Sequence, residues 1–211
     1  MRFIVCNSGV SVAALSQADI VGVSAGVGAT KGKFSGMGSA SVNLIGQRTQ
    51  AVVSGGTVNA AGLSVQSDTR GNTFALAGNL SFAVGGGQGS ALGAAVAYTQ
   101  TGTKTDGSGA GALTTRAAGN TAAIENNTTV NVGAGTVRVQ ASNTSDLMSV
   151  AASGAAADGN VGFAGTVTVN EIADVTDARV VGAGVTAGTV IVQAGEGAGA
   201  TRARIRSLDR V

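Results

Sequence analysis

The stretch Val169–Ala194, VNEIADVTDARVVGAGVTAGTVIVQA, consists of short runs of β-branched residues separated by glycines, and the chain contains the pattern twice. When the sequence is shifted so that Asp19 lies on Asp146, residues 19–66 align with residues 146–193 without a gap, and 17 of the 48 positions are identical. The identical pairs include Asp19/Asp146, Val42/Val169, Asn43/Asn170, Thr49/Thr176, Ala51/Ala178 and Gln66/Gln193. Self-similarity at a fixed period indicates a repeat architecture, in which each unit buries its apolar side chains against its neighbours.

Three consecutive repeat units account for most of the chain: residues 19–67, 72–141 and 146–194. Each unit opens with two apolar segments and ends with Thr-x-Ala, a glycine turn and a strand that closes in Val-Gln. The predicted opening strands are Ile20–Ala29 with Met37–Ile45, Phe74–Val84 with Ala91–Tyr98, and Leu147–Ala157 with Val161–Ile172.

The flanking segments complete one continuous solenoid. We interpret residues 1–18 as the tail of a preceding repeat, because Val10, Val12 and Ala14 alternate as in a strand. Residues 195–211 are interpreted as an irregular or frayed basic end. We therefore expect the chain to be a segment of a longer protein.

The composition favours a narrow all-β interior. The chain has 35 glycines, no proline and no tryptophan, and aromatic residues make up only 3%. Alanine and valine supply the apolar mass, which suits an interior one side chain wide with Val, Ile and Ala stacked inward along a β-solenoid. A unit of about 48 residues predicts about two coils of some 24 residues each, a length within the usual range of structural repeats. We expect Asn43 and Asn170 to lie at turns, where asparagine is tolerated.

The middle unit is longer than the other two. The stretch from Asn72 to Gln140 exceeds its counterpart from Asp19 to Gln66 by the length of a sizeable loop, so a loop has been inserted. We place it at residues 99–120, TQTGTKTDGSGAGALTTRAAGN. Insertions in solenoids emerge on one face, often the binding face, but a polar loop without a function is the preferred interpretation.

Few functional classes other than structure or adhesion remain open. The absence of histidine excludes His-based catalytic triads, and the single cysteine, Cys6, excludes an internal disulfide framework. We expect no catalytic site, no cofactor and no metal. Glu171, Asp174 and Asp177 are the densest acidic group, but only the third unit has them, so a solvated edge is preferred over a Ca²⁺ site.

Charge and hydropathy give further expectations about partners. The net charge is +2, yet Arg202, Arg204, Arg206 and Arg210 lie in the last ten residues, so the body is not basic and we expect no nucleic acid partner. No run of eighteen apolar residues occurs, and we expect no membrane span in this segment. End-to-end stacking with further repeats is expected because neither end has a polar capping unit.

The pattern GTVTVNEIxxxTxARVxGAxVxAGTVxVQA resembles the repeats of large secreted bacterial adhesins, which include filamentous-haemagglutinin-like and leukotoxin-like proteins and autotransporter passengers. The resemblance covers residues 19–194 and is strongest in Thr166–Ala194. It implies a right-handed parallel β-helix, export to the bacterial surface, and attachment to a ligand on host cells or surfaces. On this basis we expect a non-enzymatic structural or adhesive shaft. The alternative is a β-helix enzyme or binding module that acts on polysaccharide, with Arg138, Arg179, Asp174 and Asp177 as candidate groove residues.

Overall fold

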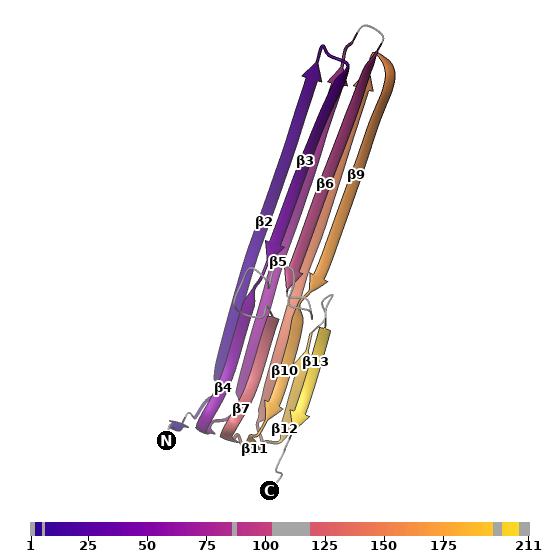
Figure 1. Ribbon diagram of the computed structural model, residues 1–211. Helices are drawn as coiled ribbons and strands as arrows, with labels where there is room; N and C mark the ends of the chain where they lie inside the picture. Colours follow the sequence, from indigo (N-terminus) through magenta and orange to yellow (C-terminus); the bar gives the residue numbers. More distant parts are fainter. Residues whose placement is uncertain (1–2, 6, 86–87, 103–118, 196–199, 207–211) are drawn as a thin grey trace.

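The computed structural model describes residues 3–5, 7–85, 88–102, 119–195 and 200–206, and every regular element in them is a β-strand. The strands run along the long axis of an elongated molecule (Figure 1). They are β1 (Phe3–Val5), β2 (Val10–Thr30), β3 (Phe34–Ile45), β4 (Arg48–Asn59), β5 (Leu63–Ala83), β6 (Gly89–Gly102), β7 (Gly119–Asn131), β8 (Thr136–Ala157), β9 (Gly159–Ala173), β10 (Val175–Val181), β11 (Gly184–Thr186), β12 (Thr189–Ala194) and β13 (Ala200–Arg206).

Three parallel sheets form a solenoid. Sheet A has the order β1-β4-β7-β10-β13, with β11 also paired to β7, sheet B has the order β2-β5-β8-β12, and sheet C has the order β3-β6-β9. Each neighbour in a sheet comes from the next turn of the chain. A turn therefore runs up one long strand of sheet B, back down a strand of sheet C, and on down a strand of sheet A (Figure 1).

The register shows one coil per repeat unit. Val10 pairs with Leu63 of the next coil, and Leu63 pairs with Val137 of the coil after that. Val10 and Val137 are related by the same offset as Asp19 and Asp146, so the sequence repeat spans two coils. The prediction of two coils within each unit is therefore wrong. Each unit is a single coil, in which the chain runs along one strand of sheet B and returns along strands of sheets C and A. Strand β2 continues without a turn for 21 residues, so no coil ends within it.

The predicted opening strands are confirmed as parts of β2, β3, β5, β6, β8 and β9. The strand that closes one unit and the strand that opens the following unit, however, form one continuous strand. Val65-Gln66 begins β5 and Val139-Gln140 begins β8, and each strand then continues into the opening strand of the following unit. Phe74 and its neighbours therefore extend a strand that started in the previous unit.

Most of the extra length of the middle coil enters between β6 and β7. Ile45 and Arg48 are close together in the chain, whereas their partners in the next coil, Thr101 and Gly119, are far apart in the sequence. The ends of the predicted insertion, residues 99–102 and 119–120, belong to β6 and β7, and residues 103–118 lie outside the described part of the chain. Smaller additions occur in the turns that follow β5 and β7.

Both flanking segments contribute strands. Within residues 1–18, β1 pairs with β4, and Val10, Val12 and Ala14 point inward from β2 as the alternation predicts. At the other end, the residues expected to be irregular include β13, which pairs with β10 from Ala200 to Arg206. The basic end is therefore a strand over these seven residues.

The basal half of the rod has a conventional core between sheets A and B. On β5, Leu63 and Val65 are buried, while Gln66 and Arg70 on the opposite face are exposed. The fully or nearly buried apolar side chains of this core are Ala51, Val58, Leu63, Val65, Ala122, Ile124, Val130, Val132, Val137, Val139, Ala141, Ala178, Val180, Ala183 and Val185. Burial of this stacked apolar surface stabilises the solenoid.

The distal half, which we call the distal arm (residues 20–45, 73–101 and 147–172), has the reverse polarity. On the same strand β5, Asn79 and Ser81 are buried, whereas Leu80 and Phe82 are 48% and 40% exposed. Strand β5 pairs with β2 and β8 without a register shift along its whole length, so no bulge causes the reversal. The prediction that Val, Ile and Ala point inward along the rod is correct for the basal half. In the arm it is wrong for valines such as Val21, whereas Ile20 and Ile45 still point inward.

Close approach of sheets B and C explains the small interior of the arm. A Cβ on Gly22 would lie 2.6 Å from Oδ1 of Asn43, and a Cβ on Gly26 would lie 3.2 Å from Cγ of Met37. Only small side chains fit on sheet B at these levels. Asn43 itself lies within β3 and points inward, where its Nδ2 donates to the carbonyl oxygen of Phe74 at 3.4 Å, so the expected turn position is wrong. Asn170 also lies within a strand, β9.

None of the described residues forms a helix that is long and apolar enough to cross a membrane.

Candidate functional site: a polar groove on sheet A

A shallow polar groove lies on the outer face of sheet A in the basal half. Outward-pointing side chains of three successive coils line it: Arg48, Gln50, Thr121, Asp177 and Arg179. The register places Gln50 of β4, Thr121 of β7 and Asp177 of β10 in one row across the sheet. Because alternate residues of a strand share a face, Asp177 and Arg179 of β10 point outward while Thr176, Ala178 and Val180 point into the core.

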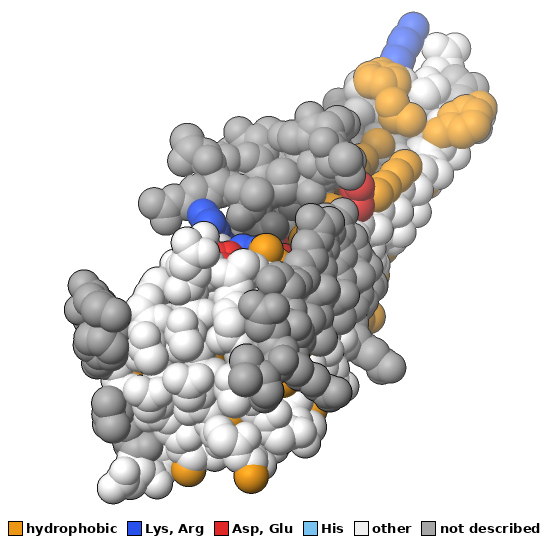
Figure 2. Space-filling model, turned by 90° about the horizontal axis from the view of Figure 1, so that it is seen from below, with side chains coloured by type: hydrophobic (Ala, Val, Ile, Leu, Met, Phe, Trp, Pro, Cys, Tyr) orange, Lys and Arg blue, Asp and Glu red, His pale blue; other side chains and the backbone are white. Residues whose placement is uncertain are grey.

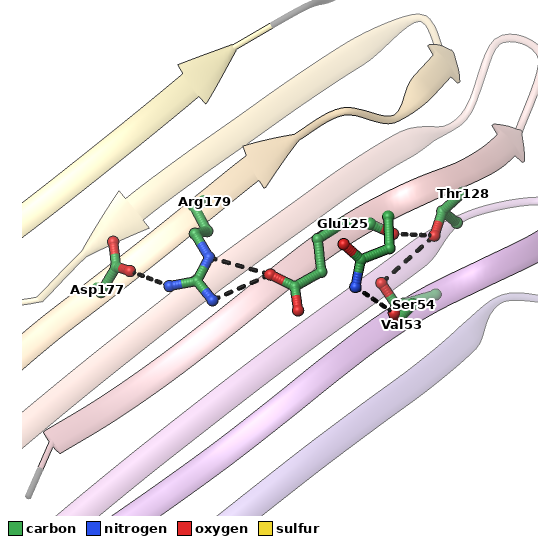
Figure 3. A network of polar contacts seen from close by, with 7 residues as sticks. Val53, Ser54, Glu125, Thr128, Asp177 and Arg179 are labelled. Atoms are coloured by element: carbon green, nitrogen blue, oxygen red, sulfur yellow. Dashed lines mark hydrogen bonds and ion pairs between the residues drawn. The ribbon is translucent and has the colours of Figure 1, made fainter. Parts of the chain in front are cut away.

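Arg179 is the centre of an ion-pair cluster in this groove (Figure 3). Its Nε and Nη2 donate to Oε2 of Glu125 at 3.2 and 3.0 Å, and its Nη1 donates to Oδ2 of Asp177 at 2.5 Å. Burial acts to lower the pKa of Arg179, but the hydrogen bonds to the two carboxylates outweigh it and the pKa is raised. The guanidinium is therefore held in its charged form and joins the adjacent strands β7 and β10.

The neighbouring strands β4 and β7 of sheet A both bend beside this cluster. Asn126 and Asn127 have left-handed backbone angles, φ 59° and 57°, and the register shifts at the neighbouring Gly55. Thr128 stabilises the bend, because its Oγ1 donates to the Glu125 carbonyl oxygen at 2.5 Å and accepts from the Gly55 amide at 2.9 Å. The bend follows Glu125 directly and fixes where β7 presents its carboxylate (Figure 3).

Asp174, another predicted groove residue, is not in the groove. Its side chain points inward at the junction of the basal half and the distal arm, where Asn143 Nδ2 donates to its Oδ2 at 3.1 Å. Burial raises the pKa of Asp174 above its ordinary value, although the hydrogen bond from Asn143 opposes that effect. The interpretation of this residue as part of a solvated edge is wrong, because only 8% of it is exposed.

The structure separates the other candidate residues as well. Arg138 lies on the outer face of sheet B, where its Nε donates to Oε1 of Gln140 at 3.0 Å. Glu171 accepts a hydrogen bond from the Tyr98 hydroxyl at 3.2 Å on the outer face of sheet C. Among the described residues no group of three acidic or sulfur ligands is close enough to hold a metal ion. Of the four predicted groove residues, only Asp177 and Arg179 come together.

Sequence reasoning missed Glu125, Arg48, Gln50 and Thr121. No motif marks Glu125, and its contact with Arg179 depends on the register in which β7 pairs with β10 of the next coil. The signal that can find these residues is the shared register: once Thr49, Asn120 and Thr176 are aligned, the neighbouring positions form one row.

The groove has the chemistry of a hydrogen-bonding surface. It presents guanidinium, amide, hydroxyl and carboxylate groups side by side, and none of the described residues that line it is aromatic. Both carboxylates next to Arg179 accept hydrogen bonds from it. No family model matches the chain, and no curated protein or solved structure matches it either.

Proposed function

We propose that the chain is a non-enzymatic structural or adhesive segment of a secreted bacterial surface protein and forms a right-handed β-helical shaft. The observation that carries the proposal is the continuous parallel pairing of equivalent strands across successive coils, with the same apolar levels repeated in the basal core. Each coil adds one strand to every sheet, so length is gained without a new fold. The similarity of the Thr166–Ala194 pattern to adhesin repeats supplies the bacterial surface location and the handedness.

The shaft function predicts an elongated particle that attaches to a surface without chemical turnover. Purified protein should appear as rods in electron micrographs and should bind cultured host cells or their extracellular matrix in a saturable manner. Antibodies raised against it should label intact cells of the bacterium that produces it. Rods that bind no surface, or labelling only after cell lysis, would contradict the adhesive part of the proposal.

A second candidate function is polysaccharide binding or cleavage at the sheet A groove. The adjacent Arg48, Gln50, Thr121, Asp177 and Arg179 favour it, because these groups can hydrogen-bond several sugar hydroxyls in a row. A glycan array tests binding, and release of reducing ends tests cleavage. Arg179→Ala should then abolish the signal, while Arg138→Ala on the outer face of sheet B should leave it unchanged.

A further inference from the structure

We propose that the distal arm is a lipid-contacting element whose two outer sheet faces lie against the acyl chains of a bilayer. The proposal goes beyond the shaft function and does not depend on it. It rests on the reversed polarity of the arm, on its dimensions, and on the side chains at its two ends.

The outer face of sheet B in the arm is entirely apolar. Fifteen positions in five rows across three strands point outward, and none is polar: Val21, Val23, Ala25, Val27 and Ala29 on β2, Phe74, Leu76, Gly78, Leu80 and Phe82 on β5, and Met148, Val150, Ala152, Gly154 and Ala156 on β8. Several are largely exposed, including Val21 at 71% and Val27 at 69%. Contiguous exposed apolar surface of this kind marks an interaction site.

The outer face of sheet C is apolar over most of its length, with Ser90 at the distal end and Gln100 and Glu171 at the base as its polar positions. Leu92, Val96, Phe163 and Val167 are exposed on the neighbouring strands β6 and β9, and no other described element covers them. Figure 2 shows apolar side chains on the distal part of the rod, while few apolar side chains appear among the described residues of the basal part in this view. A binding partner that shields the apolar surface from water must therefore cover both faces of the arm.

Among its described residues, the interior of the arm has no large apolar core whose burial could offset the exposure of these outer faces. It holds mainly alanine, glycine and polar groups, together with Met37. Asn79 Nδ2 donates to the Met37 carbonyl oxygen at 2.9 Å, and Ser81 Oγ donates to Ser35 Oγ at 3.0 Å, whereas Ser39 Oγ and Asn79 Oδ1 have no hydrogen-bond partner among the described residues. Most of the larger apolar side chains are outside, so an apolar environment stabilises the arm better than water does. Strands that alternate between apolar outer and polar inner residues are typical of β-structure in contact with lipid.

The length of the apolar surface matches a lipid layer. The strand from Val21 to Thr30, at about 3.3 Å per residue, spans about 30 Å, which is the thickness of a hydrocarbon core. Among the described residues, the charged side chains nearest to this surface lie beyond its ends, with Lys31, Lys33 and Asp158 at the distal turns and Asp19, Asp146 and Glu171 at the base.

Aromatic residues surround both ends of this surface. Phe34, Phe82 and Phe163 lie near the distal turns, and Phe74 and Tyr98 lie near the base. Five of the six aromatic residues of the chain therefore occupy these two levels. Aromatic side chains are enriched where a protein crosses from the hydrocarbon to the headgroup region.

A second copy of the chain fits the surface less well. One face of three strands spaced about 4.8 Å apart and about 30 Å long has an area of roughly 430 Å². Stable protein interfaces bury about 800 Å² on each partner, and such a partner leaves the other face exposed. A lipid layer contacts both faces at once.

The arm has open edges at β2 and β3 and at β8 and β9. Backbone groups at hydrocarbon depth need hydrogen-bond partners, so we expect inserted arms to pair edge to edge. The edge strands β8 and β2 suit this pairing, because the sequence repeat gives them the same order of inner and outer residues.

The experiment is flotation of the full chain with phosphatidylcholine vesicles, with and without an anionic lipid. We expect the protein to float with neutral vesicles in high salt, and cross-linking to give oligomers only when vesicles are present. Leu80→Glu should reduce the bound fraction roughly tenfold or more, because it places a charge at the centre of the face. The matched control, Gln66→Glu, lies on the same face of β5 in the basal half and should float like the unaltered chain.

A fluorescent probe separates insertion from adsorption. The chain has no tryptophan, so Phe82→Trp supplies a single probe, and its emission should shift to the blue and be quenched by brominated acyl chains. The control Gln66→Trp should show neither the blue shift nor the quenching. Binding only to anionic vesicles that salt reverses, a stable dimer in buffer that does not float, or an unshifted Phe82→Trp spectrum would each overturn the proposal. Far-ultraviolet spectra of each variant establish that it has folded.

Discussion

The reversal of polarity along β5 makes a direct prediction about two leucines of one strand. Leu63 occupies an odd-numbered and Leu80 an even-numbered position of this uninterrupted strand, so they point to opposite faces. Leu63 is 2% exposed in the basal core, and Leu80 is 48% exposed on the arm. Replacing Leu63 by alanine removes three buried carbons at about 0.8 kcal/mol each and leaves a cavity, which gives a cost of about 3 kcal/mol. Replacing Leu80 removes half-exposed carbons without a cavity, so we expect a cost of about 1 kcal/mol.

Urea unfolding in buffer, followed by far-ultraviolet circular dichroism, measures both values. Leu92→Ala is the matched control, because Leu92 is 48% exposed on the outer face of sheet C and should behave like Leu80. Equal losses of unfolding free energy for Leu63→Ala and Leu80→Ala would refute the reversed polarity. In that case Leu80 is buried and the lipid proposal fails with it.

Three further predictions concern the basal half. Arg179→Ala and Glu125→Ala should each lower the free energy of unfolding by about 1–2 kcal/mol, and the double variant should cost clearly less than their sum; additive losses would mean that the pair in the groove does not interact. Because burial raises the pKa of Asp174, the folded chain binds this proton more tightly than the unfolded chain. The contribution of Asp174 to stability is therefore fully present below the ordinary pKa of 3.8 and is lost as the pH rises through the folded pKa. Asp174→Asn should flatten that fall in melting temperature, and parallel profiles for the two proteins would show that another group titrates. Asn127→Val should lower the melting temperature through about 1–2 kcal/mol of backbone strain at its left-handed angle, whereas Asn127→Gly should not; equal melting temperatures would show that the bend tolerates a β-branched residue.

The repeat was readable from the sequence because equivalent residues of stacked coils have the same environment. The identities between residues 19–66 and 146–193, such as Thr49/Thr176 and Val65/Val192, predicted an all-β solenoid and most strand positions. The length of one coil was not readable in this way. The offset between Asp19 and Asp146 is compatible with several numbers of coils, and only the pairing of Val10 with Leu63 and of Leu63 with Val137 shows that it contains two.

The candidate site was only partly predictable, because the sequence does not show which residues of neighbouring coils pair with one another. Asp177 and Arg179 are next-but-one neighbours in the chain, and alternation alone places them on one face. Asp174 was assigned to the wrong environment, because its inward direction depends on where β10 begins. Glu125 comes from another coil, and the sequence contains no signal that pairs it with Arg179.

The sequence by itself determined that the chain is a β-repeat with small residues inside, since alternation, glycine turns and the absence of proline leave few other folds. The tertiary structure decided which face of each strand is inside. In the basal half sheets A and B leave room for Val, Leu and Ile between them. In the arm, Asn43 and Met37 of sheet C lie so close to Gly22 and Gly26 that only small side chains fit on sheet B at these levels. The same alternating pattern therefore gives an apolar core at one end of the rod and an apolar surface at the other.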